Sequence, residues 1–160
     1  ATDLIIIANP VKTPDGLHSI KRIMSLTEVR KHWKKDPAEE AGFVDLLRYN
    51  VEKDDLEPTP ELINGESVII KNIAGSVKGW AGNWDAVYDN ILLRGKIKQE
   101  IVDLADKLGR PELLEAKFNS ICNSSFHKIS DEIRQEIGIP LAERVFPEWK
   151  KWLEEKAKKF

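Results

Sequence analysis

The chain has 160 residues, which is enough for one domain or two small ones. Its 41% hydrophobic and 32% charged residues allow a buried core and exclude a wholly disordered chain. A net charge of −2 argues against a nucleic-acid binder, and a single cysteine, Cys122, excludes a disulfide framework and a cysteine-based zinc site.

The first predicted element is a strand over residues 4–8. This segment is the longest unbroken apolar run, too short to cross a bilayer, and its β-branched residues suit a strand buried on both faces. Asn9 and Pro10 are expected to end it. The Pro-Asp-Gly sequence at residues 14–16 is typical of a tight turn, because proline sets φ and glycine accepts a positive φ.

Residues 18–29 fit two structures. We favour a second, longer strand, because the turn before it favours a hairpin and its serines and threonine are weak helix formers. The alternative is a helix that begins at Ser25, where Ser25 and Glu28 would form a capping box. Propensity alone does not choose between the two.

The remainder of the first 60 residues is expected to form loops and short strands. A charged loop over residues 30–42, with a helical turn near Pro37, precedes a strand at residues 43–51. A polar turn at residues 52–55 leads to a returning strand at residues 56–57. Two prolines then stop the β region: Pro58 and Pro60.

Residues 61–160 are predicted to be helical. A short helix over residues 67–74 and a glycine-rich connector over residues 75–82 lead to Asn83, a suitable N-cap. Apolar residues then recur every three or four positions as far as Gly109, which indicates an amphipathic helix that ends at this glycine.

Three further helices are expected after that glycine. Pro111 opens the first, Ser130 caps a shorter one, and Pro147 starts the last. The expected fold class is therefore α+β, with N-terminal antiparallel β-hairpins over residues 1–60 followed by a C-terminal helical bundle over residues 61–160.

No segment carries a phosphate-binding loop of the Walker A type. The only Gly-Lys pair, Gly95 and Lys96, is followed by Ile97 instead of the hydroxyl that would bind Mg²⁺. Cys122 lies among apolar residues and is expected to be a small core residue. Three histidines are scattered without metal-ligand spacing: His18, His32 and His127. The sequence therefore predicts no catalytic, cofactor-binding or metal-binding residues.

The last predicted helix has an unusual composition. Residues 147–160 contain five lysines and three glutamates, and they place Trp149 and Trp152 on one face. A helix of this kind can dock on its own domain, bind a partner protein or lie on an anionic membrane. The sequence leaves all three possibilities open.

Several segments, taken in order, resemble the end of the motor domain in secretion-superfamily ATPases, the hexameric engines of type II and type IV secretion, type IV pili and the archaellum. The resemblance covers residues 3–108 and favours the strand for residues 18–29. It departs from the family at Ser25, where an acidic residue is common, and it does not extend to residues 110–160. The matching segments are residues 3–8, 13–16, 19–29, 43–57, 68–74 and 94–102, with Trp84 before the last.

This resemblance implies that the chain is the C-terminal part of an archaeal-like ATPase, with its hairpins at the edge of a RecA-like core. The family's phosphate loop, acidic boxes and histidine box would lie upstream of Ala1, so this part would not hydrolyse ATP alone. ATP and Mg²⁺ would belong to the parent protein. The parent would work in the cytoplasm at the inner face of the membrane, with neighbouring ATPase subunits and a membrane platform protein as partners.

Within this family, Lys21 and Arg22 are the best candidates for contacts with a neighbouring subunit or its bound phosphates, because arginine can stabilise a neighbour's phosphate. A solvated strand edge is the alternative for both residues. Two other functions stay open for the chain. One is a stand-alone protein–protein interaction module that uses Trp149, Trp152 and the lysines around them, and the other is a small enzyme whose site forms only in the tertiary structure.

Overall fold

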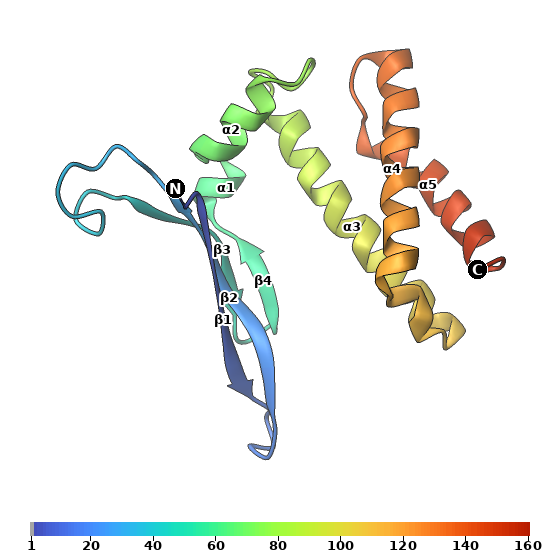
Figure 1. Cartoon of the computed structure of the whole chain (residues 1–160), viewed down its shortest axis with the longest axis horizontal. Coiled ribbons are helices and arrows are strands. Elements are labelled where there is room, and N and C mark those ends of the chain that lie inside the picture. Colours follow the sequence, from blue (N-terminus) through green and yellow to red (C-terminus); the bar gives the residue numbers. More distant parts are fainter. Residues whose placement is uncertain (1) are drawn as a thin grey trace. The chain divides into compact units, whose positions relative to one another are not determined.

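A computed structural model describes residues 2–160 as an α+β protein, with an antiparallel sheet followed by helices (Figure 1). The chain divides into two compact units, residues 1–76 and 77–160. The division falls later than the expected boundary at residue 60, because two short helices belong with the sheet. The predicted fold class is confirmed.

The sheet is a four-stranded antiparallel meander in the order β1-β2-β3-β4. Its strands are β1 (Leu4–Lys12), β2 (Ser19–Val29), β3 (Phe43–Asn50) and β4 (Asp55–Pro58). The strand for residues 18–29 is thus confirmed, and the helix from Ser25 is wrong. β1 also continues past Asn9 and Pro10, because a proline in an edge strand can leave its missing N–H on the open side.

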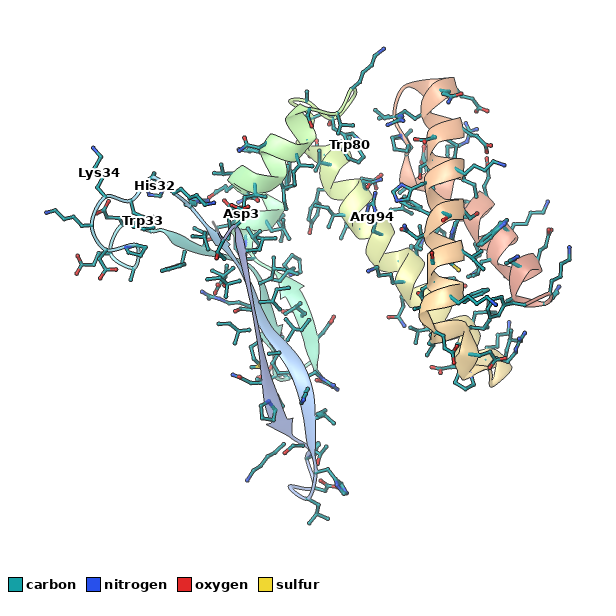
Figure 2. All side chains as sticks on the ribbon, in the orientation of Figure 1. Asp3, His32, Trp33, Lys34, Trp80 and Arg94 are labelled. Atoms are coloured by element: carbon teal, nitrogen blue, oxygen red, sulfur yellow. The ribbon has the colours of Figure 1, made fainter. Side chains whose placement is uncertain are left out.

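The predicted loop over residues 30–42 is confirmed and is folded back on itself. The carboxylate of Glu40 accepts hydrogen bonds from the backbone N–H groups of Lys34 and Lys35 at 3.0 and 2.9 Å. His32 contacts the carbonyl oxygen of the same glutamate at 2.7 Å. Figure 2 shows His32 and Lys34 on this loop.

Two short helices complete the sheet unit: α1 (Pro60–Ile63) and α2 (Val68–Gly75). The buried carboxylate of Glu28, on β2, accepts hydrogen bonds from the Ser67 hydroxyl at 2.5 Å and from the backbone N–H of Val68 at 3.0 Å. Ser67 is also the N-cap of α2, where it accepts from the N–H of Ile70. A buried acid in the sheet therefore fixes the start of α2.

The second unit contains α3 (Trp84–Leu108), a 3₁₀ turn η1 (Pro111–Leu114), α4 (Ala116–Ile137) and α5 (Ala142–Ala157). α3 begins after Asn83 and ends at Gly109, as predicted; Asn83 accepts a hydrogen bond from the N–H of Ala86, and Gly109 has φ of 62°. The helix expected from Pro111 is instead the 3₁₀ turn followed by α4.

Two predicted helix starts are wrong. Ser130 lies inside α4, where its hydroxyl is buried and has no hydrogen-bond partner among the described residues. Pro147 lies inside α5, which begins five residues earlier at Ala142. No local side chain caps α5; instead Asp89 of α3 accepts a hydrogen bond from the N–H of Ala142 at 3.0 Å. A cap supplied from another helix leaves no local pattern in the sequence.

The apolar core is concentrated in the helical unit. There, α3, α4, α5 and η1 enclose one cluster of buried side chains that includes Leu113, Phe118, Trp149 and Leu153, none of them with measurable exposure. Among residues 2–76, only three apolar side chains are buried, with 1%, 5% and 5% of their surface exposed: Leu46, Leu62 and Ala74. A sheet unit of this size with so small a core is poorly stabilised by its own contacts.

Candidate interaction surfaces

The edge strand β1 has apolar side chains exposed on both faces. Leu4 and Ile6 point to one face with 43% and 59% of their surface exposed, and Ile7 points to the other with 45% exposed. Within the described part of the chain, residues 2–160, the prediction that this strand is buried on both faces is therefore wrong. β1 contacts β2 and hardly any other described element, so no packed layer covers its two faces, and no described strand lies at its outer edge.

The far half of the β1–β2 hairpin is a two-stranded ribbon. β3 pairs with β2 only from Ser25 to Val29, whereas β1 pairs with β2 as far as Ser19. The ribbon therefore projects beyond the rest of the sheet, as Figure 1 shows for β1 and β2. An isolated two-stranded ribbon is marginally stable in water, so this part of the sheet unit lacks the support that a third strand or a packed layer provides.

Lys21 and Arg22 point to opposite faces of β2, as consecutive residues in a strand do. The Arg22 guanidinium donates two hydrogen bonds to the Asp54 carboxylate, Nε to Oδ1 and Nη2 to Oδ2, both at 2.7 Å. The Tyr49 hydroxyl donates to the same carboxylate at 2.6 Å. Arg22, and to a lesser extent Tyr49, holds the pKa of Asp54 well below its usual range.

These contacts show that Arg22 and Lys21, the two residues predicted to contact a neighbouring subunit, differ in accessibility. The guanidinium of Arg22 is engaged within the chain, so a phosphate of a neighbouring subunit would have to compete with Asp54 for it. The ammonium of Lys21 is exposed, and no described residue pairs with it. Lys21 is the more accessible of the two for a partner.

The two tryptophans of α5 also differ. Trp149 is wholly buried, and its indole N–H donates to the carbonyl oxygen of Cys122 at 3.2 Å. Trp152 is half-buried and packs against the same core. Docking of the last helix on its own domain is thus what the structure shows, and Trp149 offers no surface to a partner.

Cys122 is a core residue, as predicted. Burial raises the pKa of its thiol to about 11, so the nucleophilic thiolate is disfavoured. Among residues 2–160, no cluster of three or more His, Cys, Asp or Glu side chains is arranged to hold a metal ion. Over the same residues, every helix is too short or too polar to cross a membrane.

A groove between α3 and α4 was not predicted. It has a volume of about 360 Å³, and one of its lining residues is Arg94, labelled on α3 in Figure 2. It forms between residues far apart in the sequence, and the amphipathic pattern assigns its apolar residues to the core. The groove is lined by Arg94, Ile97, Lys98, Ile101, Asn119, Cys122, Asn123 and Phe126.

Comparisons of the chain with protein-family models, with curated proteins and with solved structures found no match.

Proposed function

We propose that this chain is the C-terminal part of a hexameric, archaeal-type secretion or pilus-assembly ATPase, with a structural and contact-forming role. The observation that carries the proposal is the exposed apolar edge strand β1 in a sheet unit with a very small core. The proposal accounts for this strand as part of a larger sheet, in which the motor domain covers it.

The residue types of β1 support this role. Five consecutive apolar residues, three of them isoleucines, are typical of a strand with protein on both faces. Exposed edge strands in monomeric proteins usually carry charges, bulges or a covering segment that block pairing with another chain. Between Leu4 and Ala8 β1 carries no charge, although the pairing with β2 shifts register after Ile7. An edge of this kind is suited to a permanent contact.

The proposed division of labour places catalysis in the rest of the parent protein. ATP and Mg²⁺ would bind to a phosphate loop outside this chain, and the sheet unit would pack on the motor domain in the cytoplasm. The neighbouring subunits and a membrane platform protein are the proposed partners. Lys21, exposed on the ribbon, is the preferred candidate for an intersubunit contact.

The alternative function, a stand-alone interaction module built on the C-terminal helix, has less support. The burial of Trp149 and Leu153 commits one face of α5 to the core of its own unit. Of the proposed binding surface, half-buried Trp152 and the exposed lysines of α5 are what remains for a partner.

The coding sequence upstream of Ala1 gives the first test. We expect it to encode, in the same reading frame, a Walker A loop followed by acidic and histidine boxes. A reading frame without a Walker A loop contradicts the proposal.

Nucleotide binding by the chain itself is a second test. A fluorescent ATP analogue titrated into the 160-residue chain should show no saturable binding, because the chain has no phosphate loop. Saturable binding would count against the proposed function.

A matched pair of substitutions in the full-length parent tests the role of β1. Ile6→Lys places a charge where we expect buried packing, so it should abolish hexamer formation and ATPase activity. Leu17→Lys makes the same change at the hairpin tip, where the side chain is 79% exposed, and should leave both unchanged. Equal behaviour of the two variants in analytical ultracentrifugation and phosphate-release assays would refute the packing role.

A further inference from the structure

The groove between α3 and α4 lies where a bundle would hold another helix. Both helices pack on α5, but they have little direct contact with each other along their lengths. In four-helix bundles the space between two such helices is filled by a further helix on the side opposite to the third. Four apolar residues form the floor of the groove, and because they belong to the core each keeps at most 6% of its surface exposed: Ile97, Ile101, Cys122 and Phe126.

The rim of the groove carries positive charge that the chain does not neutralise. Arg94 and Lys98 stand one turn apart on α3, and no carboxylate lines the groove. No described carboxylate forms an ion pair with either residue. The other wall contributes the neutral amides of Asn119 and Asn123. Elsewhere in the unit five cations pair with carboxylates: Arg110, Lys128, Arg134, Arg144 and Lys150.

Arg94 is held in place before any partner arrives. Its Nε donates a hydrogen bond to Oδ1 of Asn90 at 2.9 Å, and Asn90 has only 5% of its surface exposed. Its guanidinium carbon lies 4.9 Å from the centre of the Phe126 ring. These two contacts leave the terminal nitrogens for a carboxylate, which arginine binds with paired hydrogen bonds.

The Phe126 ring beside the guanidinium makes this charge a favourable site for an anion, although the Arg94 side chain as a whole is exposed. Desolvation lowers the pKa of Arg94, so the guanidinium has lost part of its hydration. Lys98 adds a second positive charge one turn along α3, so a ligand with acidic groups spaced by one helical turn matches both.

We propose that the α3–α4 groove binds an acidic amphipathic helix of a partner protein, which inserts an apolar side chain and pairs its carboxylates with Arg94 and Lys98. The proposal goes beyond the ATPase role and depends on the helical unit alone. The mode is that of an amphipathic helix laid in a groove between two helices. The charge on the rim selects acidic over basic helices.

A displayed library of helical peptides, with randomised apolar and charged positions, provides the probe. The full 160-residue chain is the target. We expect selected peptides to carry an apolar residue flanked, one turn away, by Asp or Glu, and to bind less tightly as salt is added. The strongest peptide should shift the backbone NMR signals of α3 and α4 around the groove.

Charge-reversal variants test the assignment. Arg94→Glu and Lys98→Glu should each weaken the selected peptide by about tenfold or more. Lys151→Glu makes the same charge change on the exposed surface of α5 and should have at most about a twofold effect. Circular dichroism checks folding, and if Arg94→Glu is unfolded, Lys98→Glu decides, because no described residue pairs with the Lys98 side chain.

Other outcomes would overturn the proposal. These are selection of basic peptides, selection of none, or peptides that bind both charge-reversed variants as tightly as the native chain. Dimerisation of the chain that is lost in Lys98→Glu would show that a second copy fills the groove, and would also refute a partner helix.

Discussion

Trp149 and Trp152 lie three positions apart on α5, yet their surroundings differ. Trp149 is enclosed by the core and hydrogen-bonded to Cys122, whereas Trp152 keeps part of its surface in solvent. Their ring centres are 6.5 Å apart. At the residue scale, burial decides which of two identical side chains supports the fold and which is accessible to a partner.

Alanine substitutions should separate these two roles. Trp149→Ala removes a buried indole and its hydrogen bond to the Cys122 carbonyl, so it should lower the free energy of unfolding by about 3–5 kcal/mol. Trp152→Ala should cost less than about 2 kcal/mol, because the side chain is half-exposed. Urea unfolding followed by circular dichroism measures both, and equal losses would contradict the assignment of Trp149 alone to the core.

The cluster of Arg22, Tyr49 and Asp54 should make the stability of the folded chain depend on pH. Because the pKa of Asp54 is lowered from 3.8, its carboxylate stabilises the folded state above about pH 4. This contribution is lost as the pH falls through the lowered pKa. Tyr49→Phe removes one donor and should raise the Asp54 pKa toward 3.8, as NMR titration of the carboxyl carbon would show. An unchanged pKa would mean that Tyr49 does not act on Asp54.

Individual elements differ in how far the sequence predicts them. The start of α3 at Asn83 and its end at Gly109 follow from local capping chemistry and were predicted. The extension of β1 and the start of α5 depend on tertiary neighbours, so local patterns missed them. No local pattern indicates the α3–α4 groove, since its rim and floor come together only when the bundle forms.

Ser130 offers a test of what stabilises the helix α4. Its buried hydroxyl has no partner among the described residues, and it sits in the middle of α4. Ser130→Ala removes the unpaired group and adds a better helix former, so it should raise the free energy of unfolding by about 0.5–1 kcal/mol. A loss of stability would show that the hydroxyl has a partner, such as a buried water, that stabilises α4.

At the scale of the whole molecule, the two units have very different cores. Almost all buried apolar side chains belong to residues 77–160, and the sheet unit exposes much of its apolar surface. Hydrophobic burial is the main favourable term in folding, so stability should be distributed just as unevenly. This contrast is what the proposed ATPase role explains, because a motor domain would supply the missing layer.

Separate expression of the two units tests this distribution. Residues 77–160 alone should keep the helical circular dichroism signal and a cooperative urea transition. Residues 1–76 alone should unfold broadly and bind the dye ANS, because their exposed apolar strands lack a packing partner. The opposite pattern, a stable sheet unit and an unfolded helical unit, would contradict the assignment of the core.

The carboxylate of Asp89, which caps α5 from α3, has a consequence for the order of folding. The capped residue, Ala142, is 53 positions away in the sequence. On the ribosome α3 emerges long before α5, so the bundle cannot close until synthesis has passed α5. Because the cap joins residues so far apart in the sequence, we expect it to form late in folding. Asp89→Ala should then speed unfolding more than it slows folding in stopped-flow urea experiments, and a larger effect on the folding rate would contradict this order.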